Sequence, residues 1–120
     1  MMANFRSSVL GAAMVLTVGL AWPATADEAA EASYVGYHHA IRAAVLCLRD
    51  DVAFDQAEHS RMGAVIDADV GFGVGAGRRL TLIEKAKAEM RDMVQKWGCD
   101  SDKLAPHLAL FHEKLEPALN

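Results

Sequence analysis

The chain has 120 residues, of which 52% are hydrophobic and 23% are charged, and its formal net charge is −4 at pH 7. A chain of this length forms one domain with a modest core. Its acidic balance, with no basic run, argues against nucleic acid and anionic lipid as partners.

Residues 1–26 have the three parts of a cleavable export signal. Arg6 is the one charged residue, an apolar run covers residues 9–22, and a small-x-small triplet ends at Ala26. The run is short for a membrane-spanning helix, so an uncleaved anchor is the weaker alternative. Cleavage would leave residues 27–120 as a single domain without a membrane span, located in the periplasm or secreted to the medium.

Two helices are expected in the first half of this domain. Apolar residues recur at steps of three and four from Glu28 to about Arg49, as on one face of a helix. The phase slips at Asp50 and Asp51, which predicts a break, with an aspartate capping a second helix over about 53–68. Since no Gly or Pro enforces the break, one bent helix is the alternative.

Two further helices are expected after a glycine-rich segment at 71–77. The cleanest helical period in the chain covers about 79–97, and Gly98 supplies a usual C-terminal stop. The last apolar stripe follows Ser101, and Pro106 fits only in a first turn, so the helix is expected from about Ala105. Four amphipathic segments without period-two alternation predict an all-α, up-and-down bundle of about four helices.

The two cysteines, Cys47 and Cys99, are predicted to form a disulfide. Exported small domains use cysteine pairs mainly in this way, whereas a metal or redox pair would sit closer, as in C-x-x-C. Cys47 falls near the end of the first predicted helix and Cys99 just after the third. In an up-and-down bundle those ends lie at the same pole, so the topology and the bridge agree.

The glycine-rich segment is also a candidate anion site, because amides at a helix N-terminus attract anions. The residues concerned are Gly73, Gly75, Gly77, Arg78 and Arg79. No preceding strand and no G-K-[ST] motif support a nucleotide site. A plain helix connection is therefore the favoured interpretation.

Histidines and a methionine provide candidate ligands for a soft metal, copper or zinc. The candidates are His38, His59, Met62 and His112, of which His59 and Met62 lie one turn apart. His38 falls on the apolar face of the first helix, and His39 points about 100° away, so these neighbours cannot clamp one ion. Without an H-E-x-x-H motif, hydrogen-bonded core histidines are favoured over metal ligands, and no cofactor is expected.

No catalytic constellation is present, since there is no G-x-S-x-G motif and no acid pair that stands out. The leading functional hypothesis is a non-catalytic binding or interaction protein of the bacterial envelope, with a protein or small ligand as partner. The plan of a small acidic helical domain with a signal and one disulfide is similar to that of acid-activated periplasmic chaperones. A chaperone-like stress role, a homodimer formed through the apolar faces, and copper or zinc binding are the further hypotheses.

Overall fold

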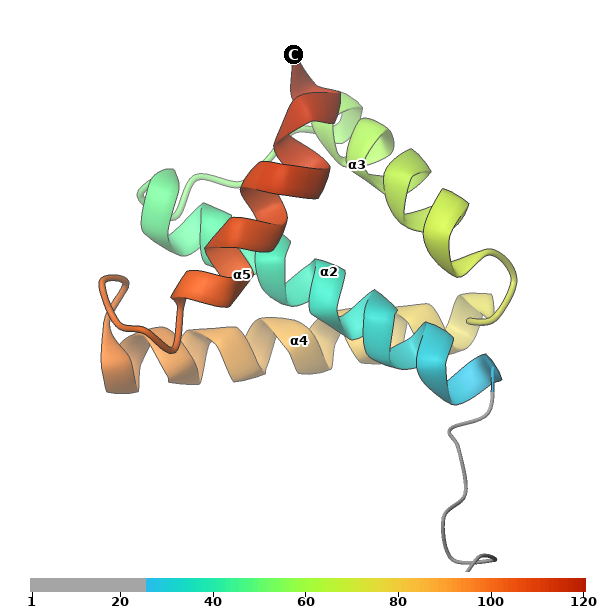
Figure 1. The fold of residues 1–120 in the computed structure, drawn as a ribbon, viewed down its shortest axis with the longest axis horizontal. Coiled ribbons are helices and arrows are strands. Elements are labelled where there is room, and N and C mark those ends of the chain that lie inside the picture. Colours follow the sequence, from blue (N-terminus) through green and yellow to red (C-terminus); the bar gives the residue numbers. More distant parts are fainter. Residues whose placement is uncertain (1–25) are drawn as a thin grey trace, which may run out of the picture.

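The computed structural model describes residues 26–120, and all regular secondary structure in that range is helical (Figure 1). The elements are α2 (Ala26–Leu48), α3 (Gln56–Val70), α4 (Ala76–Trp97) and α5 (Ala105–Leu110), then a π-helical turn η1 (Phe111–Leu115) and a 3-10 turn η2 (Glu116–Leu119). Because α5, η1 and η2 follow one another without a gap, the predicted small four-helix, all-α fold is confirmed. The predicted export signal lies outside the described residues except for its last residue.

A sharp turn separates α2 from α3. Asp50 and Asp51 adopt positive φ angles of 51° and 65°, which are incompatible with a continuing right-handed helix. The Arg49 guanidinium donates to the carbonyls of Val52 and Ala53 at 3.0 and 3.2 Å, and so holds the reversed chain in place. The alternative of one bent helix is therefore wrong.

Asp55 caps α3, which begins at Gln56, three residues later than the periodicity suggests. The Asp55 carboxylate accepts from the Glu58 amide at 2.7 Å, and the Glu58 carboxylate accepts from the Asp55 amide at 2.9 Å. This reciprocal capping box satisfies two amides that the first helical turn otherwise leaves without partners.

Asp55→Ala should lower the free energy of unfolding by about 1 kcal/mol, because it removes the N-cap acceptor. Urea denaturation followed by circular dichroism measures this loss. Asp100→Ala, an exposed change in a loop, is the control and should cost less than about 0.5 kcal/mol. Equal losses in the two variants would contradict the capping role.

The glycine-rich connection is shorter than expected, because α4 already begins at Ala76, with Gly75 as its N-cap. Gly71 ends α3 at a positive φ of 59°, and the Val74 side chain is buried in the core. At the other end of α4, Gly98 adopts a φ of 84° and donates its amide to the Val94 carbonyl at 2.8 Å. The predicted helix stop at Gly98 is confirmed.

The last helical segment begins at Ala105 with Pro106 in its first turn, as predicted. The π-helical and 3-10 geometry of its continuation, η1 and η2, was not foreseen. Pro117 has no amide hydrogen to give to a carbonyl four residues earlier, so the regular ladder cannot continue past this point. The wider π turn keeps Phe111 and Leu115 both buried in the core.

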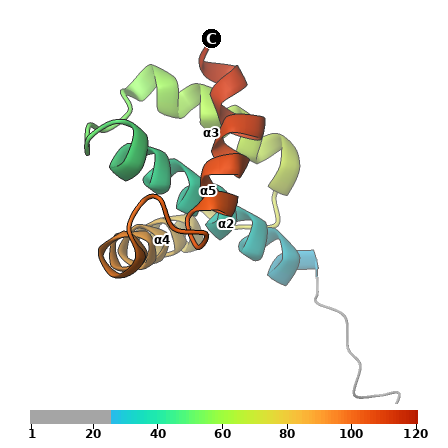
Figure 2. The same cartoon turned by 60° about the vertical axis from the view of Figure 1, so that its left-hand side comes forward.

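Helix α2 is the centre of the domain, with α4 on one side and α3 and the C-terminal segment on the other (Figures 1 and 2). Ala40, Ala43 and Ala44 are fully buried, and their small side chains let the neighbouring helices approach α2 closely. A second apolar cluster joins Ala43 to Met90 of α4 and to Leu104. The core is thus organised around α2.

A disulfide joins Cys47, in the last turn of α2, to Cys99, just after α4, with a Cα–Cα distance of 5.6 Å. The two helices run in the same direction, so their C-terminal ends lie together (Figure 1). The predicted pairing and its position at one pole are both confirmed. Among the described residues, no helix combines the length and apolarity needed to cross a membrane.

Candidate functional site

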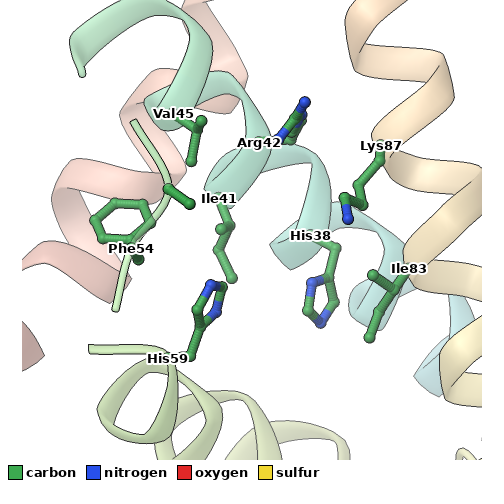
Figure 3. Close-up of a pocket in the computed structure, with 9 residues that line it drawn as sticks. His38, Ile41, Arg42, Val45, Phe54, His59, Ile83 and Lys87 are labelled. Carbon is green, nitrogen blue, oxygen red and sulfur yellow. The ribbon is translucent and has the colours of Figure 1, made fainter. Parts of the chain in front are cut away.

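Helices α3 and α4 do not pack on each other within the described part of the chain, although both flank α2. A cavity of about 190 Å³ opens between them over the α2 surface (Figure 3). We call it the imidazole cleft, because His38 of α2 and His59 of α3 both line it. Its walls therefore come from three helices and from the segment before α3.

The interior of the imidazole cleft is apolar. Ile41 and Val45 of α2 form its floor, Phe54 closes one end, and Ile83 of α4 forms a side wall (Figure 3). Phe54 is held in place because the Arg49 guanidinium lies 4.2 Å from its ring centroid. The cleft thus offers a bound molecule a rigid hydrophobic surface.

The His38 imidazole is neutral at physiological pH. Burial lowers the pKa of His38 to about 4, and the positive charges of nearby groups, His59 first and then Arg79 and Lys87, act in the same direction. Its ring also packs against Tyr34, with 4.6 Å between the ring centroids. A neutral imidazole can donate one hydrogen bond and accept another, so His38 gives the apolar cleft a polar group.

Two permanent cations line the cleft, Arg42 from α2 and Lys87 from α4 (Figure 3). Their carboxylate contacts are long, at 3.9 Å from Arg42 to Asp51 and 3.6 Å from Lys87 to Glu84. Among the described residues, none of those lining this cleft is acidic. The local charge of the cleft is therefore positive, although the whole chain is acidic.

Arg42 has an unsatisfied donor. Its Nε is buried and has no hydrogen-bond partner among the described residues. Most buried polar groups in folded proteins are paired, and leaving one unpaired costs about 1 to 3 kcal/mol. This atom has almost no surface open to solvent, so it does not itself face the cleft.

A second cavity of about 120 Å³ adjoins the first and shares His38, Ile41 and His59 with it. Arg79 and Asp67 line this extension and form an ion pair at 2.6 Å. Their charges neutralise each other, so the excess positive charge remains on the Arg42 and Lys87 side.

A hydrogen bond outside the cleft joins α3 to α2 near the glycine-rich connection. The Tyr37 hydroxyl of α2 donates to the Asp69 carboxylate of α3 at 2.6 Å. Burial and the Asp69 carboxylate raise the pKa of Tyr37 to about 12, so the hydroxyl keeps its proton. This bond ties the C-terminal half of α3 to α2.

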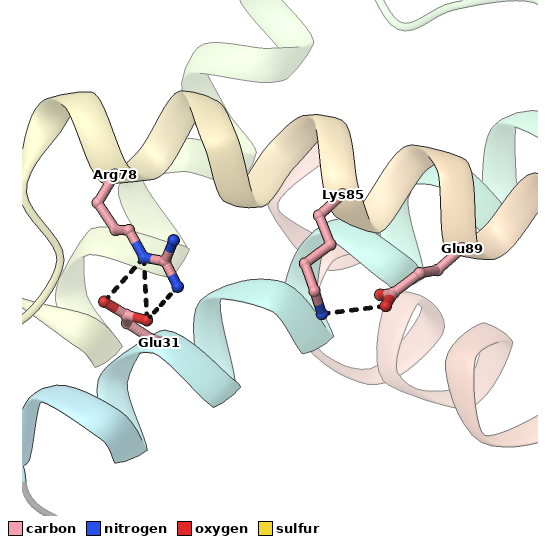
Figure 4. Close-up of polar contacts among 4 residues, drawn as sticks. All are labelled: Glu31, Arg78, Lys85 and Glu89. Carbon is pink, nitrogen blue, oxygen red and sulfur yellow. Dashed lines mark hydrogen bonds and ion pairs between the residues drawn. The ribbon is translucent and has the colours of Figure 1, made fainter.

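Both arginines of the predicted anion site make internal contacts. Arg78 binds the Glu31 carboxylate of α2 through Nε and Nη2 at 3.0 to 3.1 Å (Figure 4). Arg79 donates to Asp67 and to the carbonyls of Gly71 and Val74. Their guanidinium groups therefore hold the connection to its neighbours.

The glycines of that predicted site lie around the start of α4. Gly73 donates its amide to the Val70 carbonyl at 3.2 Å, Gly75 is the N-cap of α4, and Gly77 lies in its first turn. Anion binding at this position stays a prediction.

The structure brings together two of the four candidate metal ligands. His38 and His59 line the same cleft, whereas Met62 is fully buried in the core. His112 lies on the C-terminal segment, where its Nδ1 is 2.8 Å from the Glu116 carboxylate. The described residues contain no group of three or more His, Cys, Asp and Glu side chains placed to hold a metal ion. Metal binding also stays a prediction.

Sequence reasoning missed the partners of His39. Its Nε2 is 2.8 Å from the Glu89 carboxylate of α4, which Lys85 also contacts at 3.0 Å (Figure 4). The His107 ring lies edge-on to His39, with 5.3 Å between the centroids. These residues come from three segments far apart in the chain, so no local spacing could have revealed them.

Sequence reasoning also missed Arg42 and Lys87 as site residues. In the sequence, Arg42 directly follows the buried Ile41, and Lys87 directly follows the buried Ala86. This position beside the buried face is the only feature of the sequence that points to them as site residues. A cation at the edge of an apolar stripe is common on helices, so that signal is weak. Neither a family model, nor a curated protein, nor a solved structure matches the chain.

Proposed function

We propose that the protein is an exported, non-catalytic binding protein of the bacterial envelope, periplasmic or secreted, that holds a small ligand in the imidazole cleft. The cleft itself is the observation that carries the proposal. It combines an apolar interior, two imidazoles and two cations within a rigid frame of three helices. Such a combination is typical of ligand pockets.

The disulfide supports an exported location. Bridges of this kind persist in the periplasm and outside the cell, whereas cytosolic reductants keep thiols reduced. The Cys47–Cys99 bridge spans 52 positions and joins two of the main helices. Together with the signal predicted at residues 1–26, this favours export.

The size of the cleft favours a small molecule over an unfolded client chain. A dry cavity of about 150 Å³ is known to accept benzene, and this one measures about 190 Å³. It therefore fits one ring or a short alkyl chain. The large apolar side chains exposed among the described residues are Leu48, Val52, Phe72, Leu80 and Trp97. None of these five lines the cleft, so a chaperone-like role would need a different surface or an opened fold.

Titration of the purified protein with toluene, followed by amide NMR shifts, tests the binding function. We expect saturable changes at residues of the cleft, among them His38, Ile41 and His59. Ile83→Trp fills the cleft from α4 and should abolish them. Leu80→Trp, an exposed change on the same helix, should leave them intact. A wild-type cleft whose signals never respond to toluene would refute the proposal.

Copper or zinc binding is the second candidate, because His38 and His59 face the same cavity (Figure 3). A low pKa leaves His38 free of its proton, as a metal requires, but the nearby cations repel a metal ion. Titration of the wild type, His59→Gln and the remote His112→Gln with Cu(I) and with Zn(II) decides between these two effects. Stoichiometric binding lost only in His59→Gln would support the metal site. Weak binding of several ions per chain would exclude it.

A further inference from the structure

We propose that the ligand of the imidazole cleft is a small monocarboxylate that carries one ring-sized or short-chain apolar group. This inference rests on the proposed binding function and adds the chemical class of the ligand. The apolar group would lie on Ile41 and Ile83, and the carboxylate would lie between Lys87 and Arg42. The volume, the charge and the hydrogen-bonding groups of the cleft all favour this class.

The apolar part is limited by volume. The main cavity of about 190 Å³ holds a phenyl ring or a chain of about six carbons, but no larger ring system. Ile41, Val45 and Phe54 are almost completely buried and belong to the packed core. The walls therefore cannot retreat easily to admit a bulkier group.

The charge of the ligand follows from the charges of the cleft. Lys87 extends from α4 toward the space between Arg42 and His38 (Figure 3). The charge of Lys87 is also among those that lower the pKa of His38. Two cations and no acidic lining residue among those described would repel an amine and attract a carboxylate.

The hydrogen-bonding groups favour the same class. The Arg42 guanidinium, the Lys87 ammonium and the neutral His38 imidazole all line the cleft and have hydrogens to donate. A carboxylate offers two oxygens with about four acceptor positions, so it can serve several of these donors together. An alcohol of the same size would satisfy at most part of them.

Three probes with the same ring separate charge from size: phenylacetate, 2-phenylethanol and 2-phenylethylamine. In isothermal titration calorimetry at pH 7 and low salt, phenylacetate should bind with a dissociation constant on the order of 0.1 to 1 mM. The alcohol should bind about tenfold more weakly, and the amine should not bind measurably. Added salt should weaken phenylacetate binding and leave the alcohol unchanged.

Charge-removing variants locate the carboxylate. Lys87→Gln and Arg42→Gln should each weaken phenylacetate binding roughly five- to tenfold, because each removes one cation from a partly desolvated site. Lys87→Arg and Arg42→Lys keep the charge and should stay within about threefold of the wild type. Lys96→Gln and Arg91→Gln lie on exposed positions of α4 outside the cleft and should have no effect.

The possible failures are distinguishable. If the alcohol binds as tightly as the acid, or if Lys87→Gln and Arg42→Gln bind the acid as the wild type does, the carboxylate class is wrong. The binding function then still stands, provided that toluene occupies the cleft. If phenylacetate, the alcohol and toluene all leave the cleft signals unchanged, the ligand class and the binding function fail together.

Discussion

Removal of the Cys47–Cys99 bridge should lower the free energy of unfolding by about 4 kcal/mol. The bridge closes a loop of 52 positions. In the chain-entropy model, a loop of this size lowers the conformational entropy of the unfolded chain, and this loss corresponds to about 4 kcal/mol of stability. Domains of this size have a free energy of unfolding of about 5 to 10 kcal/mol, so the variant would lose a large share of its stability. Urea denaturation of the double variant Cys47→Ala, Cys99→Ala measures the loss.

A reducing agent supplies the matched control for the disulfide prediction. Dithiothreitol should destabilise the wild type to nearly the level of the double alanine variant, and it should leave that variant unchanged. The helical content of the folded variant should remain, because α2 and α4 also meet through the cluster of Ala43, Met90 and Leu104. A loss below about 1 kcal/mol would mean that the helix packing alone sets the stability.

Acidification should destabilise the fold through His38 before the carboxylates titrate. The pKa of His38 is about 4 in the folded protein, below the ordinary value of 6.5, so the unfolded chain binds more protons between these values. The contribution of His38 to the free energy of unfolding is complete above about pH 6.5. It falls by about 3 kcal/mol as the pH is lowered to about 4. The free energy of unfolding, measured by urea titration at several pH values, reports this slope.

Burial of the His38 ring sets the sign of this effect, and the groups that face it add to the effect. His59 comes from α3, Arg79 and Lys87 come from α4, and all three disfavour a charged imidazole. The pKa of His107 is also lowered, mainly by burial, so His107 adds a smaller slope of the same sign. Glu31 and Glu89 have pKa values lowered from 4.5 by their cationic partners, so their contribution to stability is lost only at more acidic pH.

Two variants isolate the His38 effect. His38→Gln keeps a polar side chain of similar size and should remove most of the slope between pH 6.5 and pH 4. His112→Gln changes an exposed histidine outside the cleft and should keep the wild-type slope. If His38→Gln shows the same slope as the wild type, burial of this imidazole does not control the acid response.

The helices and the disulfide were predictable because each depends on local chemistry. The apolar spacing marks the core face of α2, the positive φ at Gly98 needs a residue without a side chain, and Pro106 fits a first turn. Topology then places Cys47 and Cys99 at one pole. The start of α3 was less accurate, since Asp51 and Asp55 are both plausible caps and only the latter has Glu58 at the third helical position.

The cleft could not be predicted, because it arises from how the helices cross. His38 was correctly assigned to the apolar face of its helix, but nothing in the sequence indicated that α3 and α4 stay apart above it. The meeting of Arg42, Lys87 and His59 depends on that separation. The π turn at Phe111–Leu115 likewise depends on core packing and on Pro117. It could not be predicted, because the spacing of the apolar residues in this segment fits an ordinary α-helix.

The most direct test of the cleft as a ligand site is a measurement of nuclear Overhauser effects between phenylacetate and the protein. We expect contacts from the ring protons to the methyl groups of Ile41 and Ile83, and the loss of the Ile41 contacts in Ile83→Trp. The contrary result is a set of contacts only to exposed apolar side chains such as Leu48 or Trp97, or no contacts at all. Either of these outcomes would show that the imidazole cleft does not bind the ligand proposed for it.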